Sequence, residues 1–271
     1  MESADAVRFW QSATRMSSEF VGAYLETGRP VAHVHEEWQF AVPEVPSTLS
    51  LGAFRRFAAG ECEVTVVAPY EVHAEGVGGL ETRPRWRALF VAPAVVLDAY
   101  GAEPRFPGPV LADHAAALAL RDLLRRGEQG VAAGAELEAA IRRWLEQLLL
   151  VHAGGIRRPP RAPGLERARV YLQERPTAVV SLHEVGAAAG VTTSHLARSF
   201  SRAVGLPPMS YHVQVRLAHA QRLLAEGKPA TRVAYECGFA DQSHLNRRFK
   251  QAHGLTPGAF QAQIRGTPHA A

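Results

Sequence analysis

The sequence predicts a two-domain α+β protein, with a β-rich N-terminal half that ends in helices and an all-α C-terminal half. Its 271 residues exceed one typical domain and suit two. A stretch rich in Gly, Pro and Arg separates halves that differ in periodicity and charge. We therefore expect an N-terminal domain at 1–152, a linker at 153–164, a second domain at 165–265 and a tail at 266–271.

Short β-rich segments punctuated by Gly and Pro run through residues 1–110, for example 47–57 and 63–69. This pattern is typical of a small antiparallel barrel or sandwich.

Two segments with helical periodicity follow, at 111–127 and 133–154. In the second, apolar residues recur at spacings of three and four, as in a helix that buries one face. The pattern leaves two readings open: a helix packed only on its own domain, or one that also forms a homodimer interface through residues 133–151.

Charge is divided unequally along the chain. Residues 164–271 hold 13 Lys and Arg against 6 Asp and Glu, whereas residues 1–163 hold 17 against 20. A concentrated positive surplus is typical of phosphate binding, although it would also fit a membrane surface.

Neither a membrane span nor a secretory signal is recognisable, so we expect a cytoplasmic protein that does not enter a membrane. Its two cysteines, Cys62 and Cys237, are expected to be free, buried thiols.

A repeat identifies the basic half. Residues 185–208 align with 233–257 with eleven identities, and each copy reads as helix, Gly turn, helix and Gly stop. The turn glycines are Gly190 and Gly238, and Ser181 with Glu184 has capping-box spacing before the first copy. Helix, tight turn, helix is the helix-turn-helix pattern, whose second helix enters the DNA major groove.

The second helix of each copy has an apolar and a polar face. Leu245, Phe249 and Ala252 are predicted to point inward, as are their equivalents in the first copy. A helix expected at 210–227 joins the units, and we expect it to hold the reading helices about 34 Å apart, one turn of B-DNA.

Residues 165–265 resemble the DNA-binding domain of the AraC/XylS family of bacterial transcription regulators. The resemblance is carried by Gly238-Phe239, Asp241-Gln242-Ser243, Phe249-Lys250, Gly254 and Thr256-Pro257, and in the connecting helix by Arg216-Leu217, Ala220 and Leu223-Leu224.

The resemblance implies which residues contact DNA. The expected base contacts lie on the outer faces of the two reading helices: Ser194, Ala197, Arg198, Gln242, Ser243, Asn246 and Arg247. Arginine can donate bidentately to guanine, and Gln or Asn can pair with adenine. Arg202, Arg248 and Lys250 are expected to bind phosphate, which contributes affinity without sequence information.

Histidines mark the N-terminal half. In a strand over 31–40, His33, His35, Glu37 and Gln39 share one face, and His73 follows in a second segment. This pattern resembles the cupin-like effector domain of the same family, which implies that these five residues line a small-molecule pocket.

Metal-binding cupins carry a Glu where Gln39 stands, and an amide is a poor ligand, so the sequence predicts neither a metal nor a cofactor. A bound metal and purely structural histidines remain the alternatives for this group.

The sequence therefore predicts a non-enzymatic transcription regulator that binds double-stranded promoter DNA and responds to a small-molecule effector. A contact with RNA polymerase is a further expectation, and the sequence leaves open whether the regulator acts as an activator or as a repressor. A metal-dependent cupin enzyme fused to a DNA-binding module is the main alternative, and a sequence-tolerant architectural DNA-binding protein is another.

Overall fold

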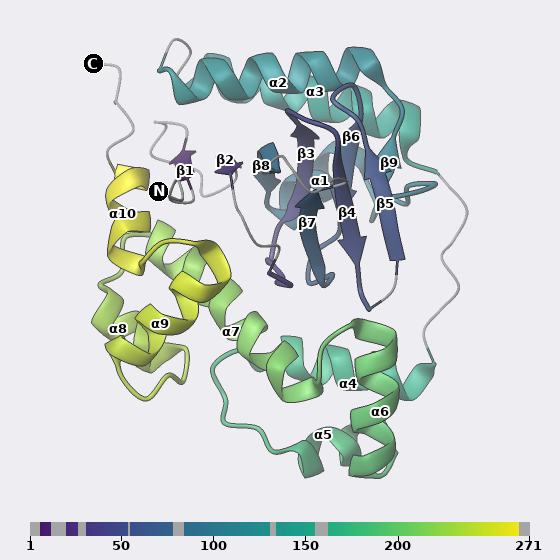
Figure 1. The fold of residues 1–271 in the computed structure, drawn as a ribbon, viewed down its shortest axis with the longest axis vertical. Helices are drawn as coiled ribbons and strands as arrows, with labels where there is room; N and C mark the ends of the chain where they lie inside the picture. Colours follow the sequence, from purple (N-terminus) through teal and green to yellow (C-terminus); the bar gives the residue numbers. More distant parts are fainter. Residues whose placement is uncertain are drawn as a thin grey trace.

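The computed structural model describes residues 6–11, 20–26, 31–53, 55–77, 84–130, 134–154 and 162–265. Strands and three helices make up the first part of the chain, and seven helices make up the part from residue 163 onward (Figure 1). The predicted α+β architecture is confirmed.

The strands form two antiparallel sheets. The larger sheet has the order β1 (Ala6–Gln11), β2 (Phe20–Glu26), β8 (Arg85–Val91), β3 (Trp38–Pro43), β6 (Val64–Val67) and β9 (Val110–Leu111). The smaller has the order β5 (Arg55–Ala59), β4 (Ser47–Leu51) and β7 (His73–Val77). Residues 47–57, which we treated as one segment, are thus divided between two strands that pair with each other.

Both faces of the larger sheet are covered. Leu89 and Val91 of β8 belong to the core shared with α1 (Pro93–Tyr100), α2 (His114–Glu128) and α3 (Ala135–His152). The alternate residues Trp86, Ala88 and Phe90 pack against helices of the C-terminal half. Because successive side chains of a strand point to opposite faces, β8 is buried on both sides by two different helical layers.

The C-terminal half consists of helices that are predominantly short. They are α4 (Pro163–Gln173), α5 (Leu182–Ala189), α6 (Thr193–Val204), α7 (Pro208–Ala225), α8 (Ala230–Glu236), α9 (Gln242–His253) and α10 (Pro257–Arg265). The α5–α6 and α8–α9 pairs are the two predicted units, and α7 joins them (Figure 1). With 18 residues, α7 is about 27 Å long.

Local signals set the helix ends as expected. Ser181 and Glu184 form the complete capping box at the start of α5. Gly205 and Gly254 end α6 and α9 in the left-handed conformation, with φ of 97° and 77°. Glycine serves these positions because it has no Cβ to clash there.

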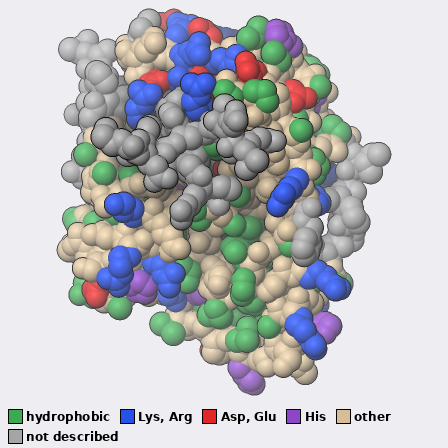
Figure 2. Space-filling model, in the orientation of Figure 1, with side chains coloured by type: hydrophobic (Ala, Val, Ile, Leu, Met, Phe, Trp, Pro, Cys, Tyr) green, Lys and Arg blue, Asp and Glu red, His purple; other side chains and the backbone are tan. Residues whose placement is uncertain are grey.

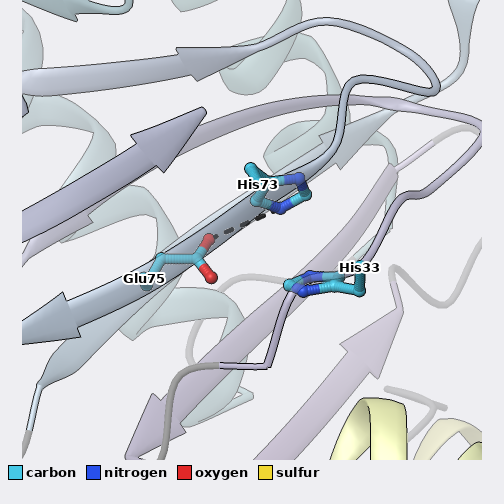
Figure 3. A group of neighbouring side chains, drawn as sticks. All are labelled: His33, His73 and Glu75. Carbon is cyan, nitrogen blue, oxygen red and sulfur yellow. Dashed lines mark ion pairs between the residues drawn. The ribbon is translucent and has the colours of Figure 1, made fainter. Parts of the chain in front are cut away.

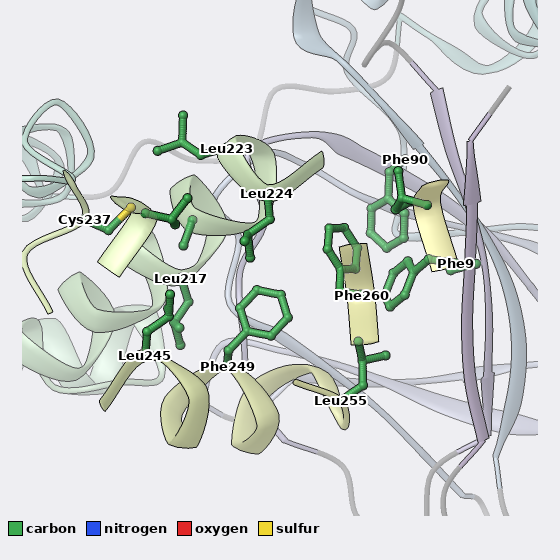
Figure 4. Packing of buried hydrophobic residues seen from close by; sticks show 14 of the residues in the cluster. Phe9, Phe90, Leu217, Leu223, Leu224, Cys237, Leu245, Phe249, Leu255 and Phe260 are labelled. Carbon is green, nitrogen blue, oxygen red and sulfur yellow. The ribbon is translucent and has the colours of Figure 1, made fainter. Parts of the chain in front are cut away.

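The two halves share buried hydrophobic cores. Phe9 of β1 meets Phe260 of α10 edge to face at 5.1 Å, and Phe249 of α9 lies 5.8 Å from Phe260 (Figure 4). Val34 and Val72 of the β half likewise pack into the core formed by α4–α7. The helical C-terminal half is thus docked on the β half in this structure.

The prediction of buried thiols is confirmed for one of the two cysteines. Cys237 is buried, but Cys62 is exposed, so the prediction of two buried thiols is wrong for Cys62, which lies in a turn between β5 and β6. The helix α3 ends at the start of the expected linker, but α4 begins at Pro163, inside the range 153–164. Residues 155–161 of the linker and the tail at 266–271 lie outside the described residues. No helix among the described residues is long and apolar enough to cross a membrane.

Candidate nucleic-acid interface and interdomain polar cluster

The two reading helices, α6 and α9, are built alike. Thr192 and Asp241, which align in the repeat, are the N-caps, and their side chains accept from the backbone N–H groups of His195 and His244. Each cap satisfies one of the unpaired donors of the first helical turn. Of the residues predicted to point inward, Leu196, Phe200, Leu245 and Phe249 are buried and Ala252 is half-buried. The prediction is wrong for Ala203, which is exposed, and the neighbouring Val204 is buried in its place.

The expected base-contacting residues lie on the outer faces. Ser194, Arg198, Gln242, Ser243 and Arg247 are exposed, and Ala197 and Asn246 are half-buried. The three residues expected to bind phosphate, Arg202, Arg248 and Lys250, are exposed as well. Figure 2 shows Lys and Arg side chains on the helical half with few acidic ones among them on this face. The outer faces of α6 and α9 are therefore accessible to a polyanion.

Arg216 of the connecting helix braces the two units. It donates to the carbonyl of Gly238 at 3.0 Å and to that of Ala178 at 2.5 Å. Gly238 is the turn glycine of the second unit, whereas Ala178 precedes the first. This bridge restricts the rotation of one unit relative to the other.

The predicted histidine group lies between the two sheets, but not as a single strand face. The strand β3 begins only at Trp38, and residues 31–37 join the sheet through one isolated bridge, between His33 and His73. The rings of His33 and His73 are 4.2 Å apart, and those of His35 and His73 are 4.7 Å apart. His35, Gln39 and His73 are buried.

Glu75, which was not predicted from the sequence, completes this group. His35 bonds to Gln39 Oε1 at 3.0 Å, and Gln39 donates from Nε2 to Glu75 Oε1 at 2.7 Å. His73 and Glu75 both belong to β7 and extend from the same face of it, with His33 opposite (Figure 3). Strand alternation from His73 could have identified Glu75, because residues two apart share a face.

The backbone carbonyl of Glu37 lies 2.7 Å from Nδ1 of His35, whereas its carboxyl group is not among the charges that shift the pKa of His35 or His73. Residues 36 and 37 form a bend, which breaks the alternation of an extended chain. Burial, together with the charge of Glu36, raises the pKa of Glu37 to about 7. Its carboxyl group therefore holds a proton more readily than an ordinary glutamate.

Burial lowers the pKa of three histidines in this region. Burial, reinforced by neighbouring histidines, lowers the pKa of His35 and of His73 well below the usual value. Burial also lowers the pKa of His253, the last residue of α9, to about 3. Its ring lies 6.5 Å from that of His33, so the group reaches the end of a reading helix.

A clasp of polar side chains joins the halves next to this group. The carboxylate of Glu36 is 3.2 Å from Nδ1 of His219 and accepts from Nε of Arg222 at 2.9 Å, and both partners belong to α7. Although burial opposes ionisation, these hydrogen bonds lower the pKa of Glu36. The Tyr211 hydroxyl, also on α7, donates to the carbonyl of Tyr70 at 3.2 Å.

A cavity of about 570 Å³ opens at the edge of the β half. It is lined by Trp38, Leu51, Arg55, Phe57, Val66, Ala68, Glu71 and residues 103–109. None of the five residues expected to contact an effector is among them. Arg55 and Glu71 form an ion pair at 3.0 Å in its wall.

The fold and the exposed faces define a helix-turn-helix DNA-binding domain in the C-terminal half. Residues 185–263 match a family described as helix-turn-helix domain. An uncharacterized HTH-type transcriptional regulator of Bacillus subtilis, YbfI, is 34% identical over 73 residues, which are 27% of this chain and 26% of that protein.

The whole chain resembles solved structures of ToxT from Vibrio cholerae. An apo structure of a single-residue ToxT variant superposes with a TM-score of 0.57 at 10% identity, over 92% of this chain and 98% of that one. The wild-type protein with bound unsaturated fatty acid gives 0.57 at 11% identity, over 98% and 97%. At such identity the likeness shows the fold, which is the same two-domain α+β arrangement.

Proposed function

We propose that this protein is a sequence-specific transcription regulator whose β half controls how two reading helices are presented to promoter DNA. The observation that carries the proposal is the pair of helix-turn-helix units on one chain, each with an exposed polar outer face. An exposed face rich in Arg, Gln and Ser supplies both phosphate and base-edge hydrogen bonds. Base contacts are assigned to Ser194, Ala197, Arg198, Gln242, Ser243, Asn246 and Arg247.

The effector is assigned to the cavity in the β half. Its volume of about 570 Å³ lies in the range of ligand pockets, and its wall combines aromatic rings with an ion pair. A ToxT structure contains an unsaturated fatty acid, which motivates testing amphipathic carboxylates here. The histidine group, predicted as the effector site, shares no residue with the lining of this cavity.

A short segment offers a route from the cavity to the reading helices. Ala68 and Glu71 line the cavity, and between them the Tyr70 carbonyl accepts from Tyr211 of α7. Tyr70 has a φ of 58°, which is unusual for a residue with a side chain. A ligand that moves this segment would therefore act directly on the helix that spaces the two units.

The test is a gel-shift experiment on the full chain with genomic fragments at moderate salt and with competitor DNA. We expect particular fragments to be selected, and Arg247→Ala to lose discrimination at particular base positions. Equal weakening on all sequences would instead indicate an architectural protein, and the absence of any selective binding would refute the regulator. The homodimer interface at 133–151 and a contact with RNA polymerase remain predictions.

A further inference from the structure

The group formed by His33, His73 and Glu75 has an unsatisfied centre. One ligand atom from each of the three side chains lies within 4.8 Å of the other two (Figure 3). The atoms His73 Nε2 and Glu75 Oε1 are 3.6 Å apart, and His73 Nε2 is buried without a hydrogen-bond partner. Leaving a buried polar atom without a partner destabilises a fold, so such an atom calls for an explanation.

Hydrogen bonds determine which ring nitrogen of His33 and of His73 carries a hydrogen. His33 and His73 each place Nδ1 2.9 Å from a backbone carbonyl, those of Val31 and Glu71. A carbonyl oxygen only accepts, so both Nδ1 atoms carry a hydrogen, which leaves Nε2 of each ring as the nitrogen able to bind a metal. Histidine ligands of metals are fixed in the same way by a hydrogen bond from the other ring nitrogen.

The spacing suits a shared ion. Two ligand atoms that each lie about 2.1 Å from a tetrahedral metal are about 3.4 Å from one another. The 3.6 Å between His73 Nε2 and Glu75 Oε1 is close to this value. Gln39 donates to the same carboxylate at 2.7 Å, which would orient it as an outer hydrogen-bond partner.

We propose that His33, His73 and Glu75 bind one divalent transition-metal ion between the two sheets. Two imidazoles and one carboxylate favour Zn²⁺, Fe²⁺ or Mn²⁺ over Ca²⁺ and Mg²⁺, which prefer oxygen ligands throughout. The carboxylate comes from Glu75 rather than from position 39, where the sequence pattern led us to expect one and found an amide. The ring of His33, one of the three proposed ligands, lies 6.5 Å from the ring of His253, the last residue of α9. An ion here would therefore lie close to the end of that helix.

The test is direct metal binding by the full chain, independent of DNA. The protein is stripped with a chelator and titrated with Zn²⁺ against a competing chromophoric chelator, and Co²⁺ is added separately to record its visible absorption. We expect one Zn²⁺ per chain and a Co²⁺ spectrum with nitrogen and oxygen ligands. Glu75→Gln keeps the side-chain shape and the acceptor for Gln39, and it should weaken binding by at least about tenfold, because a neutral amide is a poor ligand.

His183→Ala is the matched control, since it removes a histidine of α5, in the other half of the chain, and should leave the affinity unchanged. Circular dichroism establishes that each variant is folded. The proposal is overturned if the wild-type chain binds no stoichiometric Zn²⁺, or if folded Glu75→Gln and His73→Ala variants bind it as tightly as the wild type does.

Discussion

Glu37 illustrates how a single residue can depart from its sequence pattern. Alternation predicts its side chain beside the histidines, but the bend at 36–37 breaks the alternation, and the neighbouring charge that acts most on its carboxyl group is that of Glu36. There, burial and a neighbouring negative charge both oppose its ionisation. A carboxyl group with a raised pKa in the folded chain contributes stability only while it is protonated.

We predict that Glu37→Gln stabilises the protein at pH 8 but not near pH 5. In the folded chain the pKa is about 7 instead of the usual 4.5, so stability is lost as the pH rises from 4.5 through 7. The amide avoids this loss, and we expect a gain of about 1–3 kcal/mol at pH 8. Urea unfolding at both pH values measures it, with exposed Glu61→Gln as the control. A gain of the same size at both pH values would contradict the cause.

At the scale of elements, α6 and α9 share a scaffold but differ in what they present. Their caps, buried stripes and terminal glycines correspond position by position. Their outer faces do not, because Gln242, Asn246 and Lys250 align with Thr193, Ala197 and Ser201. The second helix therefore carries more groups that can bond to bases and phosphates.

We predict that Arg247→Ala costs more DNA affinity than Ser194→Ala. Loss of a bidentate arginine–guanine contact costs roughly 1–3 kcal/mol and relaxes specificity at one position. Gel shifts of both variants against one selected fragment make the comparison. Arg143→Ala, which removes an exposed arginine of α3, controls for net charge. Equal losses for the two reading-helix variants would contradict the asymmetry.

At the scale of the whole molecule, the β half contacts the same repeat position in both helix-turn-helix units. A Cβ at Gly205 would lie 2.5 Å from the carbonyl carbon of Gly52, and one at Gly254 would lie 3.0 Å from a methyl group of Val7. These glycines end α6 and α9. The β half thus holds both reading helices by their C-terminal ends, which fixes how they are presented.

We predict that Gly205→Ala disrupts the contact between the end of α6 and the backbone at Gly52, whereas the control variant Gly101→Ala leaves it intact. Both glycines have positive φ, 97° and 76°, so both variants bear the cost of alanine in that conformation. At Gly101 the added methyl group meets nothing within 4 Å, but at Gly205 it meets backbone. Hydrogen exchange at the end of α6 and after β4 should rise for Gly205→Ala alone. Unchanged exchange there would mean that the contact is dispensable.

We also predict that Glu36→Gln loosens the interdomain clasp. The side chain bonds to Arg222 across the domains, and a charged acceptor contributes more than an amide would, by about 1 kcal/mol or more. Hydrogen exchange of α7 around His219 should increase. Glu226→Gln is the matched control. Glu226 also accepts from Arg222, but it caps the C-terminal end of the same helix, so its hydrogen bond does not join the two halves. If both variants behave alike, the clasp does not couple the halves.

Short-range information made much of this structure predictable. The repeat, the apolar periodicity and the capping signals at Ser181, Gly205 and Gly254 all act within one or two helical turns. Glu75 and His253 escaped prediction because their roles depend on pairing between distant strands and on packing between domains. The position of His253 did carry a weak signal, a histidine where the first copy has the buried Val204.

The sequence by itself determined the two helix-turn-helix units and the outward faces of α6 and α9, because helix formation and amphipathic faces follow from residues three and four apart. Only the tertiary structure decided that the β half clasps α7, that Glu75 faces His33 and His73, and that the carboxyl group of Glu37 does not join these histidines. Glu36 and Arg222 are 186 positions apart, and no local periodicity relates residues at such a distance. Their contact depends on which buried surfaces the two halves press together.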